Sequence, residues 1–205
     1  MPPAATFPSD ADLVARILAS GIRTVITVPC SITAGLHAQL ADLHRRSALE
    51  LLTTNHEANL AGLAAGVWFG TGRPALIHLQ NSGLLNLGDG IVSFAQPGIF
   101  AIPLAALVTY RGASASDDSE PHQAIGARTD ALVDLIFGPA ARIRGDRLGQ
   151  EPLLPALDQV LGHAQAGGLA VLKLSPHAFR PSPVGTVMPA PPPADTASEI
   201  GRAHV

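Results

Sequence analysis

Residues 75–83 read ALIHLQNSG, a largely apolar run followed by two amides, a serine and a glycine. The run predicts a buried strand, and the residues after it predict a turn into a helix. The same order recurs along the chain. Strands are expected at 24–28, 49–53, 75–79, 102–108, 141–144 and 169–174, and helices at 10–20, 31–43, 56–70, 82–94, 124–137 and 152–165. This alternation predicts an α/β fold, with three α/β/α layers around a parallel sheet of about six strands.

Composition narrows the class of protein. Of the 205 residues, 47% are hydrophobic but only 4% are aromatic and 14% charged, so we expect a core of Ala, Val, Leu and Ile. A formal net charge of −3 provides no basic field for nucleic acid or an anionic membrane. Cys30 is the only cysteine, which excludes a disulfide framework and a thiolate metal cluster.

Neither a membrane span nor an export signal is expected. Residues 90–110 are uncharged, but Pro97 and Pro103 interrupt them, and the start of the chain does not follow the pattern of a secretory signal. We therefore expect a cytoplasmic protein. Residues 1–178 are expected to form one domain, and the Pro/Ala-rich segment 179–205 is expected to be disordered or to lie across a partner.

The unusual polar residues of the chain gather in the loops that follow predicted strands. These loops are 29–31, 55–57, 80–83 and 111–123. In an open parallel sheet, ligands bind at the carboxyl ends of the strands, so the four loops are expected to surround a site. We find no phosphate-binding glycine motif, and the Gly88-Asp89-Gly90 stretch lacks the downstream Asn that a diphosphate-metal motif needs.

Glu57 is the first candidate residue, at the start of a predicted helix. An acid in a first helical turn is favoured by the helix dipole alone, by about 0.3–1 kcal/mol, which is the simplest interpretation. However, the run HEANLAGLAAG (56–66) is rich in small residues that permit close approach of another backbone or a flat ligand. A carboxylate at the head of such a helix is well placed to bond a heteroaromatic nitrogen.

Two adjacent amides, Gln80 and Asn81, follow the strand at 75–79. The simplest interpretation is a turn into a helix with Ser82 as the N-cap. Two amides are more than a cap requires, and they offer neutral donors and acceptors to a polar ligand. In the loop 111–123, which we expect to be structureless and mobile, Arg111 suits an anion and His122 suits proton transfer. Asp117, Asp118, Glu120 and His122 match no common metal-ligand spacing, so a solvated acidic loop is favoured there over a metal site.

At these residues the sequence resembles the pyrimidine-binding domain of thiamine-diphosphate-dependent decarboxylases, namely phosphonopyruvate decarboxylase and the sulfopyruvate decarboxylase alpha subunit. The resemblance extends across roughly residues 10–175. It is carried by TVPCS (27–31), NHEANLAGLAAGVWFGTGRPALIHLQNSGLLN (55–86), IPLAALVTYRG (102–112) and EPHQAIG (120–126). In the last of these His122 precedes Gln123, whereas the family pattern has the reverse order, so either side chain is a candidate to face the substrate.

The resemblance implies roles for particular residues. Glu57 would bond the aminopyrimidine ring of thiamine diphosphate and act in catalysis, together with His122. The cofactor would also be contacted by residues matching Pro29, Gln80, Asn81, Ser82 and Gly83. The substrate, a three-carbon 2-oxoacid with a phosphonate or sulfonate group, would be bound by residues matching Ser31, Gln80, Asn81, Arg111 and His122. Arg111 is equally well interpreted as a surface residue paired with the acidic loop.

The resemblance also implies a partner. The diphosphate-binding half, which holds Mg²⁺ and the diphosphate, is expected on a separate beta subunit, giving a hetero-oligomer in which this chain is the alpha subunit of a carboxy-lyase. Two alternatives stay open from the sequence: a non-catalytic domain that binds or regulates a partner, and a subunit of another thiamine-diphosphate carboligase.

Overall fold

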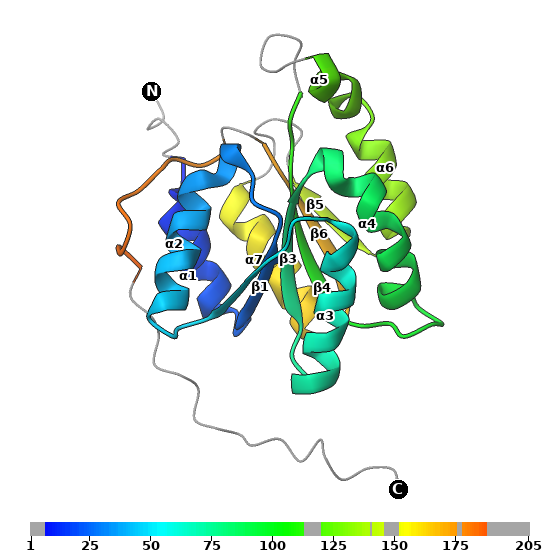
Figure 1. The fold of residues 1–205 in the computed structure, drawn as a ribbon, viewed down its shortest axis with the longest axis horizontal. Coiled ribbons are helices and arrows are strands. Elements are labelled where there is room, and N and C mark those ends of the chain that lie inside the picture. Colours follow the sequence, from blue (N-terminus) through cyan, green and yellow to red (C-terminus); the bar gives the residue numbers. More distant parts are fainter. Residues whose placement is uncertain (1–6, 113–119, 140, 146–151, 176–177, 188–205) are drawn as a thin grey trace, which may run out of the picture.

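The structure, a computed structural model, describes residues 7–112, 120–139, 141–145, 152–175 and 178–187. In these residues the expected three-layer α/β/α fold is confirmed (Figure 1). The sheet is parallel and has six strands in the order β2-β1-β3-β4-β6-β5. The strands are β1 (Thr24–Thr27), β2 (Glu50–Thr53), β3 (Ala75–Gln80), β4 (Leu104–Thr109), β5 (Arg142–Gly145) and β6 (Leu169–Leu174).

Helices cover both faces of this sheet. One layer contains α1 (Asp10–Ala19), α2 (Ala34–Arg45) and α7 (Leu153–Gln165), and the other contains α3 (Ala58–Thr71), α4 (Leu84–Gly90) and α6 (Thr129–Phe137). The remaining helical segments are η1 (Ser31–Thr33), η2 (Asn81–Gly83), the π-helical turn η3 (Ile91–Ala95) and α5 (Glu120–Gly126). No helix in the described part of the chain is long and apolar enough to cross a membrane.

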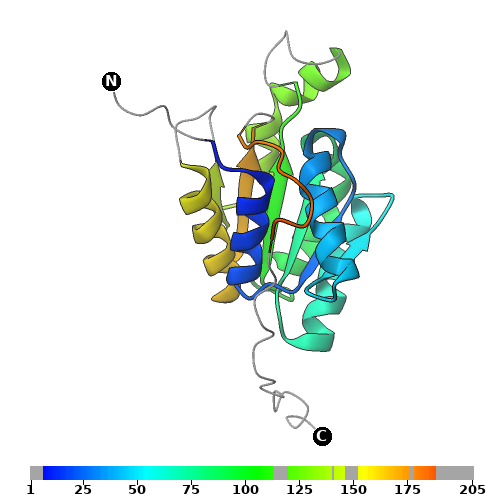
Figure 2. The ribbon, with the colours of Figure 1, turned by 90° about the vertical axis from the view of Figure 1, so that its left-hand side faces the viewer.

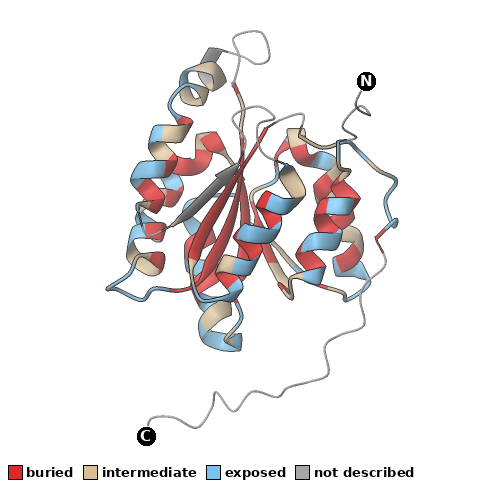
Figure 3. Ribbon diagram, turned by 180° about the vertical axis from the view of Figure 1, so that it is seen from behind, coloured by how far each residue is buried: buried red, intermediate tan, exposed pale blue. Residues whose placement is uncertain are grey.

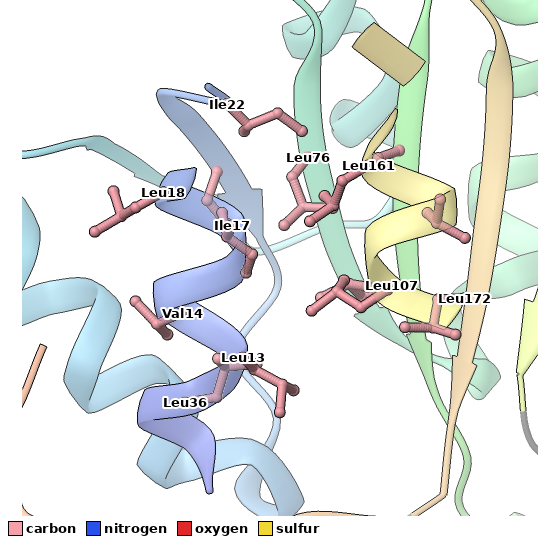
Figure 4. Packing of buried hydrophobic residues seen from close by; sticks show 14 of the residues in the cluster. Leu13, Val14, Ile17, Leu18, Ile22, Leu36, Leu76, Leu107, Leu161 and Leu172 are labelled. Carbon is pink, nitrogen blue, oxygen red and sulfur yellow. The ribbon is translucent and has the colours of Figure 1, made fainter. Parts of the chain in front are cut away.

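Strand side chains alternate between the two layers, as the period of two in a strand requires. In β3, Leu76 packs with α1, α2 and α7, whereas Ile77 packs with α3, α4 and α6. Figure 4 shows the first of these cores, built from leucine, isoleucine and valine, and Figure 3 shows the buried strands between helices whose outer faces are exposed. The core is therefore aliphatic on both faces, as the composition predicts.

The strand order identifies where the sheet opens. The chain passes from β1 outward to β2 on one side, and then returns to β3 on the other side of β1. At such a switch point the loops after the two strands diverge, and they leave a crevice at the carboxyl edge of the sheet. Here these are the loop 29–31 after β1 and the residues 80–83 at the end of β3.

Two local predictions need correction. Ser82, expected as an N-cap, does not cap a helix: it lies in the 3₁₀ turn η2 that precedes α4, and α4 has no side-chain cap. By contrast, α1 is capped by Ser9, in a reciprocal pair of hydrogen bonds with Asp12. The prediction of a structureless loop over residues 111–123 is wrong for its last part, because α5 begins at Glu120.

Residues 178–187, which follow β6 in the chain, pass over the outer sides of α1 and α2 (Figure 2). Residues 178–187 are held there by Gln39 and Arg46 of α2. Gln39 Nε2 donates to Ser182 Oγ and Pro183 O at 3.0 and 2.8 Å, and the Arg46 guanidinium donates to Val187 O at 3.0 Å. This part of the expected tail therefore lies on the domain itself. The division of the chain at residue 178 stays a prediction.

Candidate functional site

Glu57 lies between β2 and α3, where its side chain turns away from its own helix. It has helical backbone angles, φ −67° and ψ −26°, and its carboxylate makes no capping bond to the first turn of α3. Instead, Oε2 accepts a hydrogen bond from Nδ2 of Asn86, in α4, at 3.1 Å. The partly exposed carboxylate is thus held by a neutral amide.

Gly83 provides the surface on which the Glu57 side chain lies. A Cβ atom at this position would be 2.6 Å from Oε1 and 2.5 Å from Cδ of Glu57, and the three nearest heavy atoms all belong to that glutamate. The backbone angles of Gly83, φ −81° and ψ −6°, are ones that any residue adopts. The glycine is therefore required by the position of the carboxylate.

The approach of α4 to α3 has a second cause in the sequence. A Cβ on Gly90 would lie 2.7 Å from the Cβ of Ala61, so a glycine in α4 meets an alanine in α3 at the point where the two helices touch. Small residues allow such close packing. The small residues of 58–66 and 83–90 thus bring Asn86 within reach of Glu57.

Polar side chains bridge the crevice between β1 and β3. The thiol of Cys30, after β1, donates to Oε1 of Gln80 at 3.6 Å, and Nε2 of Gln80 donates to the hydroxyl of Ser82 at 2.5 Å. Cys30 is buried, Gln80 and Ser82 are half-buried, and Pro29 and Ser31 are exposed beside them. The side chains of Cys30, Gln80 and Ser82 therefore place a thiol, an amide and a hydroxyl, all neutral groups, at this crevice.

Asn81 is fully buried, and its amide is committed to protein groups. Nδ2 donates to Arg111 O at 3.0 Å and to the Thr129 hydroxyl at 2.7 Å, while Oδ1 accepts from Arg111 N at 3.0 Å. The side chain thus joins the end of β3 to the residue after β4 and to the start of α6. These bonds make Asn81 a clamp on the backbone of Arg111.

Arg111 and His122 are placed by β4 and α5, and both are half-buried. Gly112, at φ +67°, lets the chain turn beneath α5, which stands above the carboxyl end of β4 (Figure 1). A Cβ on Gly112 would lie 2.5 Å from Gln123 N, and a Cβ on Gly126 would lie 2.8 Å from Arg111 O. Two glycines therefore permit α5 to rest on the segment that carries Arg111, which keeps His122 at this edge of the sheet.

The structure offers no evidence for the acidic metal site considered from the sequence. In the described ranges, no group of three or more His, Cys, Asp or Glu residues gathers as a set of metal ligands. Asp117 and Asp118 lie outside those ranges. A hollow of about 350 Å³ lies at the opposite edge of the sheet, between Arg23 and Glu50, and is separate from the candidate site.

The structure thus brings the sequence-predicted residues together in three linked groups. Glu57 lies on Gly83, Gln80 and Ser82 bridge toward Cys30, and Asn81 holds Arg111. The consecutive residues 80–83 connect all three groups. Sequence reasoning missed Asn86 and Thr129 as partners; Asn86 had a signal, since it is three residues after Gly83 in the same helical segment, whereas nothing in the sequence indicates Thr129.

Comparison of the amino-acid sequence with known proteins identifies two relatives of this chain. No protein-family model matches the chain. The chain is 36% identical over 126 residues to a phosphonopyruvate decarboxylase of Streptomyces viridochromogenes, and 34% identical over 128 residues to a phosphonopyruvate decarboxylase of Streptomyces hygroscopicus. These matches include 61% and 62% of this chain but 30% of each relative, so the chain spans less than a third of their length. The predicted resemblance is confirmed: over the matched residues, this chain is a homologue of the phosphonopyruvate decarboxylases.

Proposed function

We propose that the chain is the pyrimidine-binding part of a thiamine-diphosphate-dependent decarboxylase that acts on phosphonopyruvate or sulfopyruvate. The observation that carries the proposal is the position of Glu57. Its carboxylate is seated on Gly83 and held by Asn86 at the head of a helix, beside the crevice between β1 and β3. The relatives are named as phosphonopyruvate decarboxylases, which favours that substrate over sulfopyruvate.

The residues at the crevice suit the aminopyrimidine ring of the cofactor. An amide and a glycine hold the Glu57 carboxylate, and within the described residues no cationic side chain forms an ion pair with it, so the anion can accept a hydrogen bond from a ring nitrogen. Gln80 and Ser82 offer neutral polar atoms, and the absence of a side chain at Gly83 leaves room for a flat ring. When bound, thiamine diphosphate supplies the electron sink for the bond that releases CO2.

The chain's own residues would have separate tasks in the reaction. Glu57 would accept a hydrogen bond from the ring and orient it. Ser31, exposed after β1, would contact a small oxoacid, and Arg111, fixed at its backbone by Asn81, would bind the phosphonate or sulfonate group. His122 on α5 would transfer a proton during product release. A carboxyl-edge site covered by α5 would keep water from the reacting carbon.

The partner proposed for this site is a chain or domain that binds the diphosphate and Mg²⁺. Support comes from the outward side of α3, the helix that begins beside Glu57. No charged residue occurs between Ala58 and Thr71, although seven of the helix's outward residues up to position 70 are exposed, namely Ala58, Asn59, Gly62, Leu63, Gly66, Phe69 and Gly70. A helix that is apolar all round is normally buried on every side.

This apolar surface continues beyond the helix. The ring of Phe69 stands edge-on to that of Phe100, with centroids 5.9 Å apart, and the centroid of Phe94 lies 6.0 Å from that of Phe100. Aromatic residues are enriched at interfaces, where they bury a large area at a small entropic cost. A partner that brings the diphosphate to Glu57 would cover this surface, so we propose it as the subunit interface.

A pair of matched variants tests the interface. Leu63→Glu introduces a charge on the outward side of α3, where Leu63 is 39% exposed, and Leu135→Glu does the same on α6, where Leu135 is 77% exposed. In copurification with a diphosphate-binding partner, Leu63→Glu should abolish the complex and Leu135→Glu should leave it intact. A complex that survives Leu63→Glu would exclude the α3 surface as the interface.

Decarboxylation itself is tested with the assembled complex. With thiamine diphosphate and Mg²⁺, it should release CO2 from phosphonopyruvate or sulfopyruvate, and the chain alone should show negligible affinity for the cofactor in calorimetry. Carboligation without net release of CO2 would favour the carboligase alternative. A complex that forms but does no chemistry would favour a regulatory domain. A cytoplasmic location stays a prediction.

A further inference from the structure

A buried polar network lies between the sheet and α2, inside an otherwise apolar layer. At its centre is His78 of β3, which is fully buried. Thr27 of β1 and Thr109 of β4 flank the imidazole: their hydroxyl oxygens lie 3.0 Å from Nδ1 and from Nε2 of His78. The hydroxyl of Thr33, at the start of α2, lies 3.4 Å from the same Nε2.

This histidine is neutral. Burial, and to a smaller extent the neighbouring imidazole of His37, whose ring centroid lies 5.1 Å away, lower the pKa of His78 to about 3. A neutral imidazole has one N–H donor and one acceptor nitrogen. The partners around His78 therefore determine which nitrogen carries the hydrogen.

The direction of the hydrogen bonds follows from Cys30. Its carbonyl oxygen can only accept, and the hydroxyl of Thr33 donates to it at 3.3 Å. Because that hydroxyl has a single hydrogen, Thr33 Oγ1 accepts from His78, so Nε2 carries the hydrogen and shares it between Thr109 Oγ1 at 3.0 Å and Thr33 Oγ1 at 3.4 Å. Nδ1 then accepts from Thr27, whose oxygen in turn accepts from Nε2 of His37 at 3.4 Å. Only the Nε2–H tautomer of His78 satisfies every contact.

We propose that His78 is a positioning residue for the loop 29–31. It holds the hydroxyl of Thr33 against the carbonyl of Cys30, while the Cys30 thiol is held from the other side by Gln80. We call this chain of hydrogen bonds, from His78 through Thr33 to Cys30, the relay. It fixes the loop that carries Ser31 at the crevice between β1 and β3. The proposal rests on the proposed function only where it takes Ser31 as a substrate residue.

The energetics agree with a positioning role. Apolar side chains of similar volume would fill this space at similar or greater stability, because a buried hydrogen bond contributes little net free energy to folding. Apolar side chains make no directional hydrogen bonds, so such a replacement would leave the loop at Cys30 free to adopt other conformations. A polar network in an aliphatic layer is a means of fixing one of them.

The loop's position can be measured without cofactor or partner, because Cys30 is the only cysteine and is 6% exposed. We would follow the rate at which dithionitrobenzoate labels the thiol in native buffer. Thr33→Val keeps the shape but removes the hydroxyl, and it should raise the labelling rate about fivefold, the factor for one hydrogen bond of ordinary strength. Thr33→Ser restores the hydroxyl and should label at nearly the wild-type rate. Equal rates for the two variants would overturn the proposal.

Two further measurements separate positioning from a general loss of stability. Leu157→Ala removes a buried side chain in α7, away from the loop, so it should lower the Tm while the labelling rate stays unchanged. Nitrogen NMR of the histidines should find His78 as the Nε2–H tautomer, and the Nδ1–H tautomer would overturn the relay. If labelling and tautomer agree with the relay but the assembled complex does no decarboxylation, the proposed function fails and the positioning role stands.

Discussion

Gly83→Ala tests whether the absence of a side chain at Gly83 determines the position of the Glu57 carboxylate. The backbone at Gly83 is helical, so an alanine is not strained there and should by itself contribute about 0.4–1 kcal/mol to stability by restricting the unfolded chain. The three heavy atoms nearest to the new Cβ all belong to Glu57, with its Cδ at 2.5 Å. The glutamate side chain must then move, at a rotamer cost of about 0.5–1.5 kcal/mol, and can lose its bond from Asn86.

These contributions nearly cancel, so the free energy of unfolding should change by less than about 1 kcal/mol. Activity should respond differently. Moving a catalytic group by about 1 Å costs on the order of 100-fold in rate, and we expect a turnover loss of that size in the assembled complex. The assays are urea unfolding of the chain, the Asn86 side-chain amide resonances by NMR, and CO2 release by the complex.

Gly162→Ala is the matched control. Gly162 lies in α7 on the opposite layer, and a Cβ there would meet nothing within 4 Å. This variant should gain up to about 1 kcal/mol of stability through helix propensity, with turnover unchanged. If Gly83→Ala keeps turnover within twofold of the wild type while Asn86 still bonds Glu57, the absence of a side chain at Gly83 does not determine the position of the carboxylate and the reasoning is refuted.

Three other outcomes are expected. Lowering the pH from 7 to 5 should lower the free energy of unfolding by about 2 kcal/mol through His78 alone, because the pKa of this histidine is near 6.5 in the unfolded chain but about 3 in the folded chain. The folded protein therefore becomes less stable as the pH falls. A His78→Gln variant that keeps the same pH dependence in urea titrations would contradict this. Asn81→Leu should destabilise by about 2–4 kcal/mol, since it removes the buried hydrogen bonds that Asn81 makes to the backbone N–H and C=O of Arg111, whereas Asn86→Leu at the surface should cost far less; similar denaturation midpoints for the two would argue against the clamp. Arg111→Ala should raise KM for the dianionic oxoacid much more than for pyruvate, and equal losses for both substrates would show that Arg111 does not bind the second anion.

The strands of the sheet could be predicted because each one is indicated by a short run of neighbouring residues. The strands at 24–28, 75–79 and 169–174 are short apolar runs that end in Gly, Pro or polar residues, and each is found within one or two residues of its predicted position. The edge that carries the candidate site could be predicted for a related reason. In a parallel sheet all strands end at one edge, so the loops that follow them lie at that edge whatever the strand order, whereas the position of the crevice along the edge depends on the strand order.

What could not be predicted depends on contacts between distant segments. The helix α5 has the polar sequence EPHQAIG, with a proline and a glycine, and the segment rests on Gly112 at a place that no local pattern indicates. The two N–H donors of the Asn81 amide bond Arg111 and Thr129, 30 and 48 residues away, and no local pattern indicates either contact. The bond between Asn86 and Glu57 spans 29 residues and becomes visible only once α3 and α4 are packed.

The relay through His78 has the same origin. Thr27, Thr33 and Thr109 look like ordinary strand and turn residues, and a single histidine in an apolar strand is usually a satisfied core residue. Their meeting depends on β1, β3 and β4 being neighbours with Thr27 paired to His78. A sequence can indicate the strands, but it does not give the register that makes these four side chains one network.

The most direct test of the central claim is exchange of the C2 proton of thiamine diphosphate in the assembled complex, followed by proton NMR in deuterated water. Glu57→Gln keeps the shape of the side chain and its place on Gly83, and it removes only the charge. We expect exchange to slow at least about 100-fold, which corresponds to a barrier higher by about 2.7 kcal/mol, in a complex that still forms and still binds the cofactor. Exchange and turnover near the wild-type rate in that variant would show that the Glu57 carboxylate does not act on the cofactor.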